Sequence, residues 1–249
     1  RPALLTLVGA VALVLLIGAA LLMKSFVRLL DVKPGFNPEN VLTFEVELPN
    51  LPPSRYERDA EQTAFFQQLT ARLQALPGVE TAGGVLSLPL SGAVESTDII
   101  LPGQQDTPDG HRPQADYTMV TPGYFTTLQI PLLQGRHFSE QDKLDAPLVI
   151  MINDTMAGRL WPGENAIGKR LRVGFEEKER EVIGVVGTIK QTALDAEVQP
   201  AMYMPQLQSP TNRLTLLVRT RGEPLSMAAA VRQEVRALDK DVPVTQVQT

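Results

Sequence analysis

Residues 42–48, LTFEVEL, and residues 59–76, DAEQTAFFQQLTARLQAL, decide the fold class, because a strand pattern is followed closely by a helix pattern. In the first stretch, apolar residues alternate with Thr and Glu, which is the period of a strand with one buried face. In the second stretch, apolar residues recur at the spacing of one helix face. Pro77-Gly78 ends this helix, and residues 79–88 form another apolar run. The region therefore predicts a strand–helix–strand unit.

The C-terminal end of the chain repeats this arrangement. Leu214, Leu216 and Val218 alternate with polar residues as in a strand, and Gly222-Glu223-Pro224 opens a helical pattern that reaches Leu238. Two such units at opposite ends of the chain predict a split α/β plait that brings the termini together. We assign residues 38–90 plus 206–249 to this split α/β subdomain.

Between these two units, residues 91–205 contain short strand patterns separated by turns. Thr121-Pro122 is expected to start one short helix, with Thr121 as its N-cap, and Asn153 or Asp154 is expected to cap another. This segment predicts an inserted β-rich subdomain, and the fold class as a whole is α+β. Its strand patterns cover residues 97–101, 116–120, 148–152, 169–173 and 181–186.

The N-terminal stretch has a different composition. Residues 2–23 carry no charged side chain, and as a helix of 22 residues they span about 33 Å, enough to cross a hydrocarbon core. A cleaved signal peptide is the alternative, but its apolar region is usually only about 7–15 residues long. The pattern continues as a helical stalk until Lys33-Pro34-Gly35. Residues 1–32 are therefore expected to form a transmembrane helix and stalk.

Composition excludes several classes of function. The chain has 23 basic and 28 acidic residues, a net charge of −5, which disfavours a nucleic-acid surface. The absence of cysteine excludes disulfides and thiolate chemistry. Lys24, Arg28 and Lys33 after the expected span would by themselves favour a cytoplasmic domain, but long domains translocate with little regard to charge. Charge therefore leaves the orientation open.

Candidate catalytic and metal-binding residues are few. His111 and His137 have no spaced partner ligands, and metal sites need convergent ligands. Gly184-Val185-Val186-Gly187 lacks the third glycine and the following helix of a dinucleotide fingerprint, and no phosphate-binding loop is present. We therefore expect no catalytic, cofactor-binding or metal-binding residue and no enzymatic activity. The acidic pairs, for which turn and cap roles are expected, are Asp106/Asp109, Asp142/Asp145 and Asp239/Asp241.

Several ordered motifs together resemble the MacB-type permeases of ABC transporters, and specifically the orphan subgroup known from acidobacteria. The most specific stretch is RLWPGE at 159–164 with IGKRL at 167–171. The match extends over essentially the whole chain. The other motifs are LMKSFVRL at 22–29, PGFNPENVL at 34–42, LPGVE at 76–80, TPGYF at 121–125, GRHF at 135–138, VIGVVG at 182–187 and MYMP at 202–205.

The resemblance implies a periplasmic core domain that follows the first transmembrane helix of a permease in the bacterial inner membrane. It also implies that the α/β subdomain is porter-like and that the β-rich part is inserted into it. It implies a non-catalytic role in which ATP-driven movement is transmitted across the membrane for efflux or export. The implied partners are a cytoplasmic ABC ATPase, which would bind the ATP, a second permease copy, a periplasmic adaptor or outer-membrane component, and membrane lipid. Nucleic acid is not an expected partner.

Two other classes of protein remain open at this point. A single-pass membrane sensor or binding module would use the extracytoplasmic domain to capture a ligand. A membrane-anchored enzyme is disfavoured by the missing catalytic motifs. The substrate, the ATPase and any ligand site are not determined by these motifs.

Overall fold

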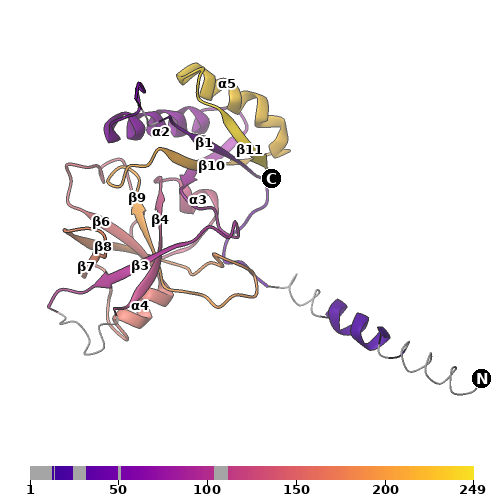
Figure 1. The fold of residues 1–249 in the computed structure, drawn as a ribbon, viewed down its shortest axis with the longest axis vertical. Coiled ribbons are helices and arrows are strands. Elements are labelled where there is room, and N and C mark those ends of the chain that lie inside the picture. Colours follow the sequence, from indigo (N-terminus) through magenta and orange to yellow (C-terminus); the bar gives the residue numbers. More distant parts are fainter. Residues whose placement is uncertain (1–12, 14, 25–31, 50–51, 104–111) are drawn as a thin grey trace, which may run out of the picture.

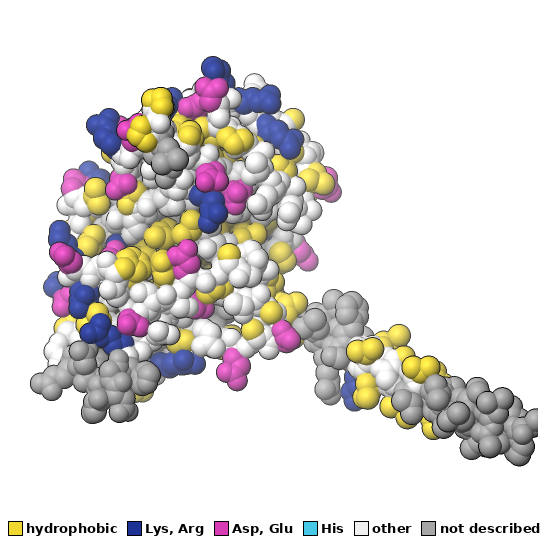
Figure 2. Space-filling model, in the orientation of Figure 1, with side chains coloured by type: hydrophobic (Ala, Val, Ile, Leu, Met, Phe, Trp, Pro, Cys, Tyr) yellow, Lys and Arg dark blue, Asp and Glu magenta, His cyan; other side chains and the backbone are white. Residues whose placement is uncertain are grey.

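The computed structural model describes residues 13, 15–24, 32–49, 52–103 and 112–249. The expected transmembrane helix and stalk fall mostly outside these residues. Residues 15–24 are helical, and their leucines are exposed, as the hydrophobic surface of this segment in Figure 2 shows. Within the described part of the chain, no helix is both long and apolar enough to cross a membrane.

The two ends of the chain build one antiparallel sheet. The first unit comprises β1 (Val41–Glu47), α2 (Asp59–Gln74) and β2 (Val79–Val85). The second comprises β10 (Arg213–Thr220), the 3-10 turn η1 (Pro224–Met227), α5 (Ala228–Leu238) and β11 (Val244–Gln248). The strand order β11–β1–β10–β2 interleaves the units, and Figure 1 shows both helices on one side of the sheet. The expected strand–helix–strand units at both ends are confirmed.

Alternation along β1 and β10 creates the first core. Leu42, Phe44 and Val46 of β1 and Leu216 of β10 face the helices, where they meet Phe66 of α2 and its neighbours. All five of these side chains are fully buried. Burial of the helix stripe against this sheet face is what stabilises α2 and α5, because isolated helices of this length are marginal in water.

The middle of the chain forms a closed ring of strands. The pairings run β4–β3–β7–β8–β6–β9 and return to β4 through a parallel β4–β9 ladder. Closure removes the unpaired edges that open sheets expose. An additional strand, β5 (Leu132–Gly135), pairs with β8. The ring strands are β3 (Glu95–Ile100), β4 (Gln114–Val120), β6 (Val149–Asn153), β7 (Arg170–Val173), β8 (Glu179–Val186) and β9 (Ala201–Pro205).

Two short helices accompany the ring. α4 (Asp154–Leu160) begins as expected, because the Oδ1 atom of Asn153 accepts a hydrogen bond from the Met156 N–H at 2.8 Å. The expected Thr121 cap is wrong: α3 (Tyr124–Thr127) has Gly123 at its N-cap position. The Thr121 hydroxyl instead accepts the Gly84 N–H at 2.8 Å, since β2 lies close enough to compete for it.

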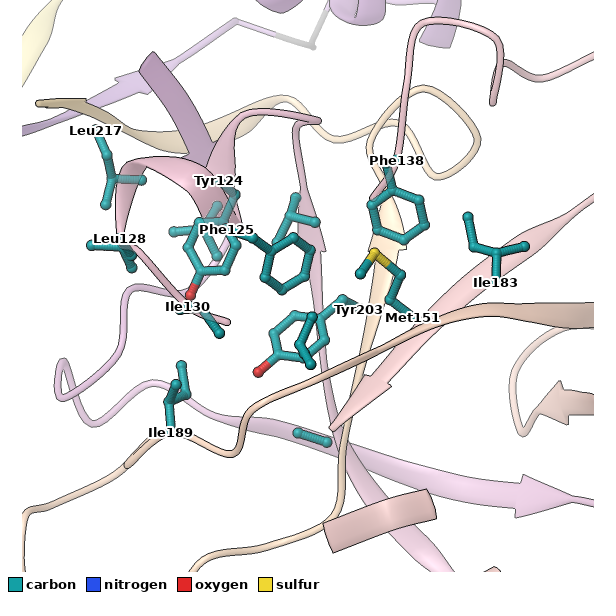
Figure 3. Packing of buried hydrophobic residues seen from close by; sticks show 14 of the residues in the cluster. Tyr124, Phe125, Leu128, Ile130, Phe138, Met151, Ile183, Ile189, Tyr203 and Leu217 are labelled. Carbon is teal, nitrogen blue, oxygen red and sulfur yellow. The ribbon is translucent and has the colours of Figure 1, made fainter. Parts of the chain in front are cut away.

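The β-rich segment is less separate than the sequence indicates. β2 pairs with β4 at Val85 and Val120, so one continuous sheet contains strands of both parts. A second core also joins them. Figure 3 shows Tyr124 and Phe125 of α3 packing near Tyr203 of β9 and Met151 of β6. The sequence could not show this joint, because hydrogen-bonded neighbours in a sheet are decided by tertiary contact. The residue ranges of the subdomains remain a prediction.

Candidate functional site

The segment that follows the expected stalk is held to the ring part of the domain. The Lys190 N–H donates to the Pro34 carbonyl at 2.8 Å. Gly35 has φ +87°, and a Cβ atom there would lie 2.4 Å from the Thr188 carbonyl oxygen. Only glycine tolerates both the conformation and the close approach. Pro34-Gly35 therefore brings the chain directly against residues 188–190.

A second set of bonds holds the same segment to the end of α3. The Asn37 N–H donates to the Leu128 carbonyl at 2.8 Å, and the Asn37 amide donates to Gln129 Oε1 at 3.0 Å. The Asn37 Oδ1 atom accepts the Glu39 N–H at 2.9 Å, which closes a local turn. Phe36 packs against the second core. The polar side chain at position 37 thus orders the turn and docks it.

Arg219 of β10 links the entering segment to the end of α3. Its guanidinium donates to three carbonyl oxygens: Nε to Thr127 at 2.8 Å, Nη1 to Glu39 at 2.6 Å and Nη2 to Asn37 at 2.6 Å. The residue is only 5% exposed. Burial lowers the pKa of this group, while Glu80 and Glu39 oppose the shift. A planar donor with fixed geometry is suited to binding several carbonyls at once.

We call residues 34–40 with Arg219, residues 127–129 and residues 188–190 the stalk junction. The junction joins the entering chain to β10 of the sheet, to α3 and to the segment that follows β8. It contains hydrogen bonds to backbone groups, the close approach of Gly35 to Thr188, and the packing of Phe36 against the second core. Its chemistry is that of a mechanical attachment.

The histidines occupy different places. His111 lies outside the described residues, as do Asp106 and Asp109. His137 stacks on Phe125 with ring centroids 5.6 Å apart, and burial lowers its pKa. Its Nδ1 atom is buried and has no hydrogen-bond partner in the described part of the chain. The structure therefore brings no second histidine or carboxylate to His137 at bonding distance among those residues.

The remaining acidic pairs are bonded to other residues of the domain. Asp142 is buried, and its carboxylate accepts hydrogen bonds from both Nη atoms of Arg136 at 2.7 Å and from the Ser139 N–H at 2.8 Å. Burial alone would raise its pKa, but these partners hold it below its ordinary value. Asp145 faces Lys143 at 3.5 Å. Asp239 accepts the Tyr56 hydroxyl at 2.8 Å and the Asp241 N–H at 2.9 Å.

The glycine motif at 184–187 serves close packing. A Cβ atom at Gly184 would lie 2.6 Å from the Arg136 carbonyl oxygen and 2.7 Å from the Met151 side chain. At Gly187 it would lie 2.8 Å from the Pro131 ring. No group of three or more metal-ligand side chains occurs in the described ranges.

Arg219 was missed by the sequence interpretation. It follows Val218 in the strand pattern, so alternation places it on the face opposite the helices, where an arginine is ordinary on a solvated surface. The available signal was its position on a strand whose neighbour, β2, contains Gly83-Gly84, since paired glycines in a strand indicate a close approach of other backbone. That covering backbone is α3.

Comparison with known proteins identifies this architecture. A family model of the MacB-like periplasmic core domain matches residues 3–238. The chain belongs to the family of MacB-like periplasmic core domains. No curated protein matches the sequence.

Solved structures share the fold of this MacB-like domain. The periplasmic region of MacB from Actinobacillus actinomycetemcomitans superposes with a TM-score of 0.54 at 15% identity, covering 88% of this chain and 94% of that one. The extracellular domain of the noncanonic ABC-type transporter YknZ from Gram-positive bacteria gives 0.50 at 19% identity, covering 82% and 100%. A permease-protein domain from Porphyromonas gingivalis gives 0.50 at 14%, covering 88% and 92%. MacB-like core domains are components of ABC-type permeases, so the chain is a transporter component by family.

Proposed function

We propose that this domain transmits movement of a membrane stalk into rearrangement of the periplasmic part of an ABC-type permease, for efflux or export. The stalk junction is the observation that carries the proposal. Arg219 and the Pro34-Gly35 segment attach the entering chain to the sheet, α3 and the ring through direct hydrogen bonds. Force applied to the stalk would therefore reach both parts of the domain.

Movement of this kind would need several partners. A cytoplasmic ABC ATPase would bind and hydrolyse ATP, and a second permease copy would supply the opposing stalk. A periplasmic adaptor or outer-membrane component would receive the movement. The domain would stand in the periplasm, anchored in the inner membrane by residues 1–32. Within the family, the ordered motifs favour the acidobacterial orphan-permease subgroup.

A flexible insertion tests the transmission. Two glycines placed between Lys33 and Pro34 lengthen the attachment and leave every described contact of the domain in place. In the complete transporter we expect ATP hydrolysis to continue while export falls at least tenfold. The same two glycines between Gly92 and Ala93, in the exposed loop between β2 and β3, are the matched control. Normal export with the Lys33–Pro34 insertion would contradict the proposal.

The orientation of the domain is tested separately. The chain has no cysteine, so Lys178→Cys introduces a single thiol at an exposed position. A membrane-impermeant thiol reagent should label it in cells with a permeabilised outer membrane. Ile152→Cys, at a fully buried position, is the control that should stay unlabelled in the folded protein. Labelling of Lys178→Cys only after lysis would place the domain in the cytoplasm.

A further inference from the structure

A groove runs along the face of α2 that is turned toward the ring part of the domain. Its inner cavity measures about 390 Å³ and lies between Thr70, Ala71 and Gln74 of α2 and the segments around Thr121 and Gln206. Its outer cavity measures about 420 Å³ and lies between the start of α2 and residues 143–145. Both volumes are in the range of ligand sites, which often occur where two parts of a protein meet.

The two cavities form one continuous recess. Gln67, Glu140 and Leu207 line both of them. Gln67 Nε2 donates to Glu140 Oε2, so one exposed hydrogen bond crosses the groove at the border between the cavities. A single bond of this kind contributes little to stability and can be exchanged for a bond to a ligand.

The walls of the groove combine small side chains with an unpaired amide donor. On α2 the groove is lined by Ala60, Ala64 and Ala71, which allow another main chain to approach closely. Gln206 is 1% exposed, lines the inner cavity, and its Nε2 atom has no hydrogen-bond partner in the described part of the chain. A buried amide donor without a partner costs free energy that an acceptor in the cavity would recover.

The charged residues of the outer cavity favour a positively charged ligand. The outer cavity carries the carboxylates of Asp59, Glu140 and Asp145 against the single ammonium of Lys143, which faces Asp145 at 3.5 Å. The groove is therefore acidic in total. α2 is 16 residues long, which is about 24 Å of helix or about seven residues of extended chain.

We propose that this groove binds a short, positively charged peptide in extended form. Peptide carbonyl oxygens supply acceptors for the amides of Gln206 and Gln67, the alanines leave room for the main chain, and lysine or arginine side chains meet the three carboxylates. Cavities of this size suit a free peptide and not a folded protein, which would need a larger and flatter surface. The site does not depend on the proposed role of the stalk junction.

Fluorescence anisotropy tests the site with the full chain in a nonionic detergent. The probe is a labelled, capped six-residue peptide of alternating alanine and lysine, and the control peptide has glutamate in place of lysine. We expect saturable binding of the lysine peptide that is at least tenfold tighter than that of the glutamate peptide. Absence of binding, or equal binding of the two peptides, overturns the proposal.

Substitutions on one helix locate the binding. Ala64→Trp fills the outer cavity and Ala71→Trp fills the inner one, and each should weaken binding at least tenfold. Gln68→Trp, on an exposed position of the same helix outside both cavities, is the matched control and should change affinity less than twofold. Equal affinities for Ala64→Trp and Gln68→Trp overturn the proposal.

A substitution that changes charge without changing size tests the groove independently of the tryptophan variants. Glu140→Gln retains a side chain that can bond to Gln67 but removes one of the three carboxylates. We expect about threefold to fivefold weaker binding and a smaller dependence of affinity on salt. Unchanged affinity and salt dependence would exclude this groove as the site of the cationic peptide. This readout does not involve ATP hydrolysis or export, so it fails or succeeds apart from the transmission proposal.

Discussion

Arg219 illustrates how a single side chain can hold a domain entrance together. A surface arginine contributes little, but this one is buried and donates to three carbonyl oxygens that would otherwise lack these partners. Removing it takes a charged donor from all three carbonyls and leaves the buried Thr127 carbonyl without this partner. The cost of the substitution is therefore predictable from the structure.

Arg219→Met should lower the free energy of unfolding by about 3 kcal/mol, since it removes three hydrogen bonds from a charged donor and leaves the buried Thr127 carbonyl without this partner. Urea unfolding of the full chain measures this difference. Arg213→Met, on the same strand but exposed, is the matched control and should stay within about 0.5 kcal/mol of the unmodified protein. Equal effects of the two substitutions would show that the buried contacts of Arg219 carry no stability.

Asp142 gives a pH dependence at the same scale. Burial raises its pKa, but Arg136 and Ser139 outweigh burial and hold the pKa below the unfolded value of about 3.9. The pair therefore contributes stability above the unfolded pKa and loses it as the pH falls through the folded pKa.

Asp142→Asn should lower the free energy of unfolding by about 2 kcal/mol at pH 7, because bonds to a charged partner are lost. The difference from the unmodified protein should shrink steadily between pH 5 and pH 3. Urea unfolding at several pH values measures it. A difference that stays constant across this range would contradict the assigned role of the ionised carboxylate.

At the scale of elements, the approach of β2 to α3 depends on glycine. A Cβ atom at Gly83 would lie 2.6 Å from the Tyr124 nitrogen and 2.7 Å from its Cα atom. Both are backbone atoms and cannot move independently of α3. This contact also brings Tyr124 and Phe125 into the second core, so the spacing of two elements determines how that core is filled.

Gly83→Ala should therefore destabilise the protein by about 2 kcal/mol, since added volume must displace backbone. Gly158→Ala, in the interior of α4 with nothing within 4 Å of the added Cβ, is the matched comparison and should stabilise by about 0.5–1 kcal/mol. Thermal unfolding shows both shifts, which should have opposite signs. A stabilising effect of Gly83→Ala would mean that α3 does not contact β2 as described.

At the scale of the whole molecule, the strands β11–β1–β10–β2, here called the outer sheet, and the ring share one hydrogen-bonded sheet and one core. Val41 and Leu217 come from the outer sheet, while Met151 and Tyr203 come from the ring, and all four lie in the same cluster. Because this cluster cannot be divided without exposing both sides, we expect the two parts to unfold together.

Trp161 makes this expectation measurable. It is the only tryptophan and packs in the core of the ring, whereas the two longest described helices, α2 and α5, cover the outer sheet. Tryptophan fluorescence and far-ultraviolet circular dichroism should therefore give the same urea midpoint in a single transition. Two separated midpoints would show that the ring and the outer sheet unfold as independent units.

The elements themselves were largely predictable from local pattern. β1, α2, β10 and α5 follow the periods of two and 3.6 that one-sided burial imposes, and the Asn153 cap follows from its side-chain chemistry. β5 and β9 were not predicted. β9 is an apolar run buried on both faces and therefore lacks alternation, and β5 is short, mostly exposed and ends in glycine.

The sequence by itself determined the α+β class and the two strand–helix–strand units, because these depend on periodicity along the chain. It also determined the apolar character of residues 2–23, which is a matter of composition. Only the tertiary structure decided the ring closure through β4 and β9, the burial of Arg219 and the groove along α2. Each of these depends on which distant segments meet. A polar residue such as Arg219 looks the same in sequence whether water or another backbone covers it, since covering is a property of the folded chain and not of its local pattern.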